Sequence, residues 1–222
     1  MCPYSCSMGK YDVVVFDNDG VLVDSEPISN RVLAEYLTEL GHPTTFEESV
    51  RDYMGAAVHR IHDLVLERSG QRLPEDFDET FHDRVFTAFR SELRAVDGVH
   101  EVLAKLDADG VPYCVASSGS HERIRVALQR TGLYEHFGER RIFSAQDVGQ
   151  GKPAPDLFLL AGETMGVRPD RCAVVEDSPL GVQAALAAGM DVYGFASMMP
   201  REKLAGATAY FSRMEELPAL LS

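Results

Sequence analysis

Short apolar runs recur along this chain, and each leads through a few polar residues into a stretch of helical periodicity. Residues 12–16, Asp-Val-Val-Val-Phe, form the first run, and its β-branched residues are typical of a strand buried on both faces of a parallel sheet. From residue 98 onward, runs and helical patterns alternate, which predicts an α/β fold with helices on both faces of the sheet. The later runs lie at 111–116, 141–145, 172–175, 191–196 and 208–211, and the helical patterns at 98–109, 121–131, 155–166, 179–188 and 200–206.

The stretch from about residue 27 to residue 93 breaks this alternation. Its apolar residues recur three and four positions apart, and Gly41 ends the first such pattern, which begins at Pro27. Three more helical segments follow at 46–54, 58–66 and 77–93. The sequence therefore predicts an all-helical domain inserted into a discontinuous α/β core, with the two linkers side by side. The predicted domains are 1–24 with 95–222, and 27–93.

The formal net charge is −14, from 35 acidic and 21 basic side chains. This excess of acidic side chains argues against a chain whose main role is to bind nucleic acid or an anionic membrane, because both are negatively charged and are bound mainly by Lys and Arg. No apolar run reaches the ~18 residues of a membrane span, and residues 1–10 lack the apolar region of a secretory signal. Met8 is an alternative start to Met1. We expect a cytoplasmic protein, a monomer or a weak dimer.

Cysteine usage agrees with that expectation. The four cysteines form no CxxC pair, and a reducing compartment fits them. The two that lie inside apolar runs are expected to be small buried hydrophobic residues. In chain order the four are Cys2, Cys6, Cys114 and Cys172.

Side chains that can carry chemistry follow four of the apolar runs. In an open parallel sheet, ligands bind beyond the carboxyl ends of the strands, so the residues after each run are the candidates for a site. We expect four acids, two hydroxyls, a glycine and a lysine to meet at one edge of the sheet. They are Asp17 and Asp19 after the first run, Ser117, Ser118 and Gly119 after the second, Lys152 beyond the third, and Glu176 and Asp177 at the fourth.

The chemistry of this set indicates phosphoryl transfer. Clustered carboxylates repel one another unless a cation lies among them, and Mg²⁺ is the usual oxygen-liganded cation beside a phosphate. Ser117 and Lys152 are suitable phosphate partners, and the amides around Gly119 could add N–H donors. Each piece alone has a simpler interpretation as a helix cap or a turn residue. Their joint placement after successive strands favours a site.

Four short motifs contain these candidate residues. The first two are Val-Val-Phe-Asp17-Asn-Asp19-Gly-Val-Leu-Val-Asp-Ser and Val-Ala-Ser117-Ser. The third and fourth are Gly-Lys152-Pro-Ala-Pro and Val-Glu176-Asp177-Ser. In this order they resemble the four motifs of the haloacid dehalogenase-like superfamily of phosphohydrolases. The insertion after the first motif is similar to the helical cap of the sugar-phosphatase and β-phosphoglucomutase branch. The resemblance implies a Rossmann-like core with an inserted all-helical cap.

The resemblance also implies residue roles. Asp17 matches the nucleophile that forms an aspartyl-phosphate, and Asp19 matches the general acid and base. The resemblance matches Ser117 and Lys152 to the residues that hold the phosphate, and the turn at Ser118 and Gly119 completes the predicted phosphate site. A Mg²⁺ site follows from Asp17, the Asp19 carbonyl, Glu176 and Asp177. The halide-releasing branch lacks the second aspartate, so Asp19 argues against that chemistry. Candidate substrate contacts in the cap are Glu26, His59 and Arg60.

Other kinds of site fit less well. A nucleotide-binding P-loop needs Ser or Thr after its lysine, where this chain has Pro153, and a serine-hydrolase elbow needs Gly where it has Val115. His59 and His62 lie three residues apart on an expected helix, but no cysteine or carboxylate partner is evident in the sequence. An exposed helix face is therefore favoured there over a zinc site. A non-catalytic binding module is disfavoured, because every chemical position is intact.

The predicted function is a Mg²⁺-dependent phosphatase that acts on small phosphorylated metabolites, sugar or sugar-acid phosphates above all. The alternative is a phosphosugar mutase of the β-phosphoglucomutase type. The mutases carry a cap-hinge histidine where this chain has Ser29, and a cap arginine where Val58 or His59 falls. Both departures favour hydrolysis.

Overall fold

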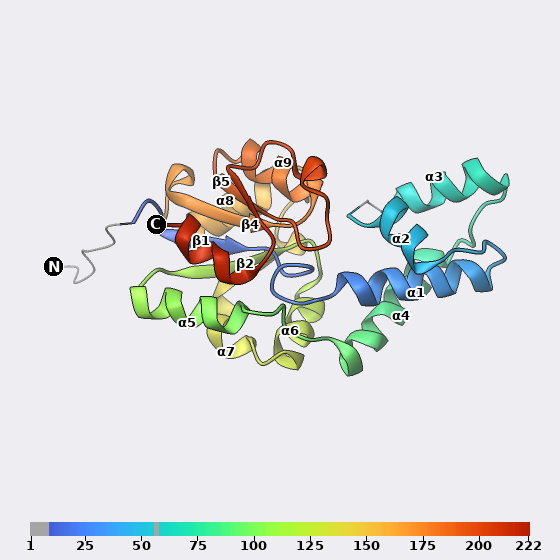
Figure 1. The fold of residues 1–222 in the computed structure, drawn as a ribbon, viewed down its shortest axis with the longest axis horizontal. Coiled ribbons are helices and arrows are strands. Elements are labelled where there is room, and N and C mark those ends of the chain that lie inside the picture. The colour runs from blue at the N-terminus through green and yellow to red at the C-terminus, as the bar shows by residue number, and fades with distance from the viewer. Residues whose placement is uncertain (1–8, 56–57) are drawn as a thin grey trace. The chain divides into compact units, whose positions relative to one another are not determined.

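The computed structural model describes residues 9–55 and 58–222. Cys2, Cys6 and the choice between Met1 and Met8 lie outside the described residues. The chain divides into two compact units. The core unit comprises Met1–Val23 and Ala95–Ser222, and the helical unit comprises Asp24–Arg94 (Figure 1).

The core unit is built on a six-stranded, all-parallel sheet in the order β3-β2-β1-β4-β5-β6. The residues of β1, β2, β3 and β4 are all buried, as expected for continuous apolar runs sandwiched between helices. The α/β fold predicted from the sequence is therefore confirmed. The strands are β1 (Val13–Phe16), β2 (Tyr113–Ser117), β3 (Ile142–Ser144), β4 (Cys172–Glu176), β5 (Asp191–Phe195) and β6 (Ala209–Phe211).

Strand register brings the site residues to one edge. Phe16, the last residue of β1, lies opposite Val115 of β2 and Val175 of β4. The residues that follow each of these strands therefore leave the sheet at the same level. Asp17 continues the ladder, since its N–H donates to the Val175 carbonyl at 2.9 Å.

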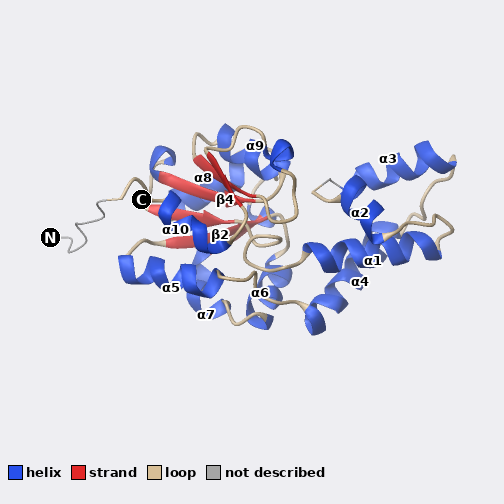
Figure 2. Cartoon of the chain, in the orientation of Figure 1, coloured by secondary structure: helices blue, strands red, loops and turns tan. Residues whose placement is uncertain are grey.

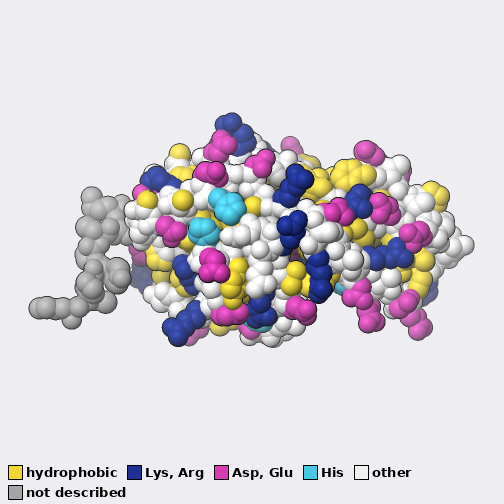
Figure 3. Space-filling view, turned by 90° about the horizontal axis from the view of Figure 1, so that it is seen from below, with side chains coloured by type: hydrophobic (Ala, Val, Ile, Leu, Met, Phe, Trp, Pro, Cys, Tyr) yellow, Lys and Arg dark blue, Asp and Glu magenta, His cyan; other side chains and the backbone are white. Residues whose placement is uncertain are grey.

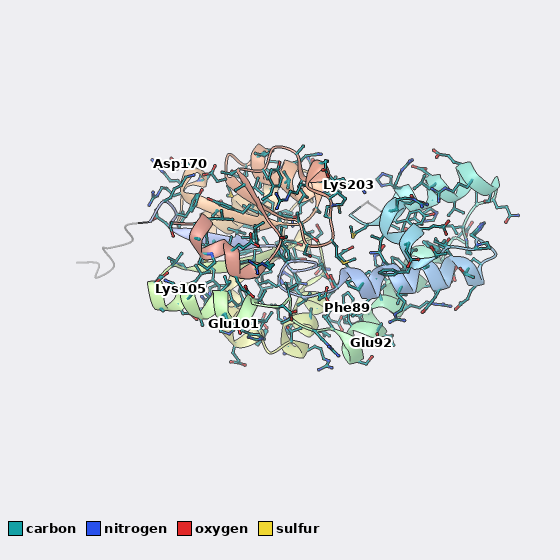
Figure 4. All side chains as sticks on the ribbon, viewed as in Figure 1. Phe89, Glu92, Glu101, Lys105, Asp170 and Lys203 are labelled. Atoms are coloured by element: carbon teal, nitrogen blue, oxygen red, sulfur yellow. The ribbon has the colours of Figure 1, made fainter. Side chains whose placement is uncertain are left out.

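Helices cover both faces of the sheet, with α5, α6 and α7 on one side and α8 and α9 on the other (Figure 2). On α5 the apolar residues face the core, while Glu101 and Lys105 are exposed (Figure 4). Cys114 and Cys172 are buried free thiols, as expected. The helices of this unit are α5 (Val99–Asp109), α6 (His121–Arg130), α7 (Tyr134–Phe137), α8 (Asp156–Thr164), α9 (Pro179–Ala187) and α10 (Leu217–Leu220).

One predicted helix, over residues 200–206, is wrong. The structure has only a short 3-10 helix there, Arg201–Leu204. Gly206 has a positive φ of 96°, which ends helical geometry and leads the chain into β6. Helices α7 and α10 are too short for periodicity to reveal, and the sequence did not predict them.

The helical unit contains α1 (Glu26–Glu39), α2 (Phe46–Tyr53), α3 (Val58–Ser69) and α4 (Phe77–Glu92), and no strand among its described residues. Its core includes Phe77, which is fully buried and stacks on Tyr36 with ring centroids 5.2 Å apart. Thr45 begins α2 with a capping box, in which Thr45 and Glu48 satisfy each other's backbone N–H groups.

The two chain segments that join the units are paired with each other. Within the core unit, Val23 and Ala95 form an antiparallel bridge, and the Val96 N–H donates to the Leu22 carbonyl at 3.0 Å. Within the helical unit, the Asp24 N–H donates to the Arg94 carbonyl at 2.9 Å. The first and last residues of the helical unit therefore lie next to each other in space.

None of the helices in the described part of the chain is long and apolar enough to cross a membrane. On the face seen in Figure 3, acidic and basic side chains are interspersed rather than gathered into one patch. The net negative charge is therefore not concentrated on that face.

Candidate active site

A buried ion pair forms the centre of the site. Lys152 Nζ donates to Asp17 Oδ1 and to Glu176 Oε1, both at 2.6 Å, and to the Ala116 carbonyl at 3.2 Å. Its side chain is 4% exposed. An ammonium has three N–H donors, so Lys152 uses all of them to link the ends of β1, β2 and β4. In this state Lys152 holds Asp17, and a phosphate would have to take over one of these bonds.

Burial shapes the ionisation of this pair. Burial raises the pKa of Asp17 to about 7, while the Lys152 ammonium opposes the shift and the Glu176 carboxylate adds to it. Burial alone would lower the pKa of Lys152, but the carboxylates of Asp17 and Glu176 raise it, so the lysine stays charged. The site therefore keeps a fixed positive charge beside the carboxylate that ends β1.

Glu176 is fully buried and fully bonded. Its Oε1 accepts from Lys152, and its Oε2 accepts from the backbone N–H and from the hydroxyl of Ser178, both at 2.9 Å. Ser178 is the N-cap of α9 and accepts from the Gly181 N–H at 3.0 Å. A Cβ at Gly181 would overlap the Glu176 carboxylate. The Glu-Asp-Ser segment thus caps α9 and also positions Glu176.

Three carboxylates lie close enough to share one cation. Asp17, Glu176 and Asp177 each offer an oxygen, and these oxygens lie within 4.8 Å of one another. Gly20 supports this arrangement, because a Cβ there would overlap the Asp177 carboxylate. Hard oxygen donors of this kind fit Mg²⁺. The residues present therefore fit the metal that the sequence predicts.

The carboxylate of Asp19 is not part of that group. Its Oδ1 accepts from Arg123 Nη2 at 3.1 Å, although 104 residues separate the two. The structure thus brings three of the four predicted carboxylates together, and gives Asp19 a different partner. This agrees with the expected ligand set, in which Asp19 contributes its backbone carbonyl and not its carboxylate.

The turn after β2 holds the predicted phosphate-binding residues. Ser117 is buried and accepts from the Gly119 N–H at 3.1 Å, while Ser118 is exposed. Since its oxygen accepts that bond, the Ser117 hydroxyl keeps its proton to donate. A second hydroxyl fixes the turn: Ser144, fully buried at the end of β3, donates to the Gly119 carbonyl at 2.6 Å.

The predicted substrate contacts of the helical unit lie on two of its helices. Glu26, in the first turn of α1, accepts from the Asn30 side chain at 3.2 Å. His59 and Arg60 are exposed on α3, and Arg60 pairs with Glu67 at 3.6 Å. His62 has a carboxylate partner that was not evident in the sequence: its Nε2 lies 2.7 Å from Asp78 Oδ1 in an exposed pair. Asp78 belongs to α4, and only folding brings it close to His62 on α3.

Four residues around the site were missed by sequence reasoning. Arg123 and Ser144 sit inside an ordinary helical and an ordinary apolar pattern, so nothing local marks them. Gly20 and Gly181 did carry a signal, since each stands a few residues after an acid of the site. Each of these glycines makes room for a carboxylate.

Comparisons with known proteins identify relatives of this chain. Two curated relatives come from Escherichia coli (strain K12). A 6-phosphogluconate phosphatase is 29% identical over 215 residues, covering 96% of each chain. A fructose-1-phosphate phosphatase is 34% identical over 188 residues, covering 82% of this chain and 95% of its own.

A solved structure has the same fold. It is a HAD family hydrolase from Deinococcus radiodurans R1 with bound phosphate and sodium, which matches with a TM-score of 0.83 and 32% identity over 96% of each chain. The family model of haloacid dehalogenase-like hydrolases matches residues 11–189, which carry all four motifs of the site. With strand order, site geometry and relatives in agreement, this chain belongs to the haloacid dehalogenase-like hydrolases.

Proposed function

We propose that this chain is a Mg²⁺-dependent phosphatase that hydrolyses small phosphate monoesters, sugar or sugar-acid phosphates above all, through an aspartyl-phosphate. One observation carries the proposal. The Asp17 carboxylate ends the central strand, beside the charged Lys152 and within a group of three oxygen ligands. A carboxylate can attack an anionic phosphate only where positive charge offsets the repulsion. The curated relatives named above are phosphatases of phosphorylated sugars and sugar acids.

In the first step, an oxygen of Asp17 attacks phosphorus, and the bond between phosphorus and the alcohol oxygen breaks. Asp19 gives its proton to that oxygen, so the alcohol leaves neutral. In the second step, a water oxygen attacks the same phosphorus, and the bond to Asp17 breaks. Asp19 takes a proton from the water, which regenerates both aspartates and releases inorganic phosphate.

Other residues of the core hold the phosphoryl group. Ser117 donates its hydroxyl hydrogen to a phosphoryl oxygen, and the Gly119 N–H, which donates to the Ser117 oxygen, orients that hydroxyl. The Ser118 amide is the proposed further donor to the same phosphoryl group. Lys152 supplies fixed positive charge. Asp17, Glu176 and Asp177, with the Asp19 carbonyl, would hold Mg²⁺, which when bound neutralises charge on the phosphoryl oxygens.

The helical unit would select the substrate as a cap. Glu26, His59 and Arg60 are the proposed contacts to the rest of the molecule. Together they offer one carboxylate, one imidazole and one guanidinium, which suits a polyhydroxylated, anionic metabolite. A cytoplasmic location fits such a substrate.

Two substitutions test the mechanism. Asp17→Asn removes the attacking anion, so phosphate release from fructose 1-phosphate and 6-phosphogluconate should fall below detection. Asp19→Asn keeps the nucleophile and should lower turnover by about 10²–10⁴-fold for these alkyl esters. Retention of most activity by Asp17→Asn would refute the assignment of the nucleophile.

A coupled assay separates the phosphatase from the mutase. With β-glucose 1-phosphate and glucose 1,6-bisphosphate as primer, a phosphatase releases stoichiometric inorganic phosphate. A mutase instead forms glucose 6-phosphate, which glucose-6-phosphate dehydrogenase detects. We expect phosphate, because Ser29 at the matching position has no imidazole to gate proton transfer. Fast NADPH formation with little phosphate would favour the mutase.

A further inference from the structure

The second aspartate of the site has its own cation. Arg123 Nη2 lies 3.1 Å from Asp19 Oδ1, and the two side chains are 24% and 22% exposed. Asp17, two residues earlier, pairs with Lys152 instead. Two aspartates that lie two residues apart on one loop are therefore held by two cations from different parts of the chain.

The stem of the Arg123 side chain lies close to the turn after β2. A Cβ at Gly119 would lie 3.4 Å from Arg123 Cδ and 3.5 Å from Ser117 Oγ, so the stem of Arg123 runs across the turn that carries Ser117. The backbone N–H of Arg123 donates to the hydroxyl of Ser120, the N-cap of α6, at 3.2 Å. The positions that the Arg123 guanidinium can reach are therefore restricted by the Ser120 N-cap of α6 and by the turn at Gly119.

We propose that Arg123 is a positioning residue for the reaction: its guanidinium holds the carboxyl group of Asp19 in the position from which it gives a proton to the leaving alcohol oxygen. This inference rests on the proposed function, in which Asp19 is the proton donor. Folding stability is a weak explanation for the pair, because partly exposed ion pairs contribute little to it. Control of the position of the Asp19 carboxyl group is a stronger explanation, since displacing a catalytic group by ~1 Å can lower the rate about 10²-fold.

The helix that carries Arg123 offers a matched control. Arg125 lies two residues further along α6 and pairs with Glu139 at 2.9 Å, with its side chain 40% exposed. Arg123→Gln and Arg125→Gln therefore remove the same charge and one ion pair each from the same helix. Only the first removes a contact to the site.

The readout is the single-turnover release of the leaving alcohol from two substrates. Fructose 1-phosphate has a poor leaving group that needs a proton, whereas para-nitrophenyl phosphate releases a stable phenolate. Arg123→Gln should slow release of fructose by about 10–10²-fold with little change in KM. It should slow release of nitrophenol far less. Arg125→Gln should leave both rates within about twofold of the wild-type values.

Equal slowing of both substrates by Arg123→Gln would overturn the proposal, because it would indicate a general defect in the site. Wild-type rates for both would overturn it as well. Arg123→Lys keeps the charge but lacks the planar fork, and should fall between the wild type and the Gln variant. Should Arg123→Gln fail to fold, Arg123→Lys decides: wild-type rates on both substrates would contradict the proposal.

Asp19→Asn separates this inference from the function on which it rests. The proposed function requires Asp19→Asn to slow fructose release much more than nitrophenol release. If it slows both alike, the proton-donor role fails, and the role of Arg123 fails with it. If Asp19→Asn is selective but Arg123→Gln matches the control, only the inference on Arg123 fails. In the Asp19→Asn background, Arg123→Gln should add no more than about twofold, since the group that it positions is gone.

Discussion

Gly181 lies so close to Glu176 that any side chain at residue 181 would overlap the Glu176 carboxylate. Both residues belong to the segment that ends β4 and begins α9. The first turn of α9 is therefore packed directly on an acid that contacts Lys152.

We predict that Gly181→Ala lowers kcat by about 10²-fold, because Glu176 must move and Lys152 then loses one of its three partners. Overpacking should also destabilise the fold by about 1–3 kcal/mol. Steady-state kinetics and thermal melts measure both effects. Gly149→Ala is the control, since a Cβ there meets nothing within 4 Å. Normal kinetics in Gly181→Ala would contradict the tight packing around Glu176.

Metal removal tests the group formed by Asp17, Glu176 and Asp177. Phosphate release should vanish in EDTA and return with Mg²⁺. Ca²⁺ should inhibit, because its larger and looser coordination favours bidentate binding of Asp17, which occupies the oxygen that must attack. Titration of Mg²⁺ against the thermal midpoint provides a reading independent of turnover, and Asp177→Asn should weaken that response. Full activity in metal-free buffer would exclude a metal at this site.

Ser144 should matter for phosphate binding, because it supports the turn that we propose as the phosphate site. Ser144→Ala removes the hydroxyl that holds the Gly119 carbonyl, so the turn amides lose their fixed orientation. We expect the inhibition constant of inorganic phosphate to rise by about threefold to tenfold, which corresponds to about the net worth of one hydrogen bond. Ser91→Ala in the helical unit is the control. An unchanged inhibition constant would show that the turn needs no such support.

Asn18, between the two aspartates of the site, is fully buried. Among the described residues, its Oδ1 and Nδ2 atoms have no hydrogen-bond partner. Such a buried amide costs about 1–3 kcal/mol, so Asn18→Leu, which has a similar shape, should stabilise the core. The thermal midpoint should rise by about 2–4 °C per kcal/mol. A lower midpoint would mean that the amide contributes to stability.

The sequence predicted the sheet well because β1, β2 and β4 are buried on both faces and read as continuous apolar runs. Parallel register then places the residues that follow these runs at one edge, so most of the site was predictable too. The ion pair between Asp19 and Arg123 was not predictable from the sequence. Arg123 lies on a helix whose pattern is that of any amphipathic helix, and only the fold closes the 104 residues between them. The same holds for His62 and Asp78, which belong to different helices.

Pairing of the two linkers has a consequence for how the core folds. β1 and β2 are neighbours in the sheet, yet the whole helical unit lies between them in the sequence. Closing a loop of that length is entropically costly for an unfolded chain, and the cost grows with the logarithm of the loop length. Once the helical unit has folded, the Asp24–Arg94 hydrogen bond holds its ends together, and only residues 17–23 and 95–112, which include α5, remain to be ordered between β1 and β2. We therefore expect the helical unit to fold first and to increase the folding rate of the core unit. Destabilising it, for example with Phe77→Ala, should slow refolding of the sheet in stopped-flow experiments, and an unchanged refolding rate would argue against this order.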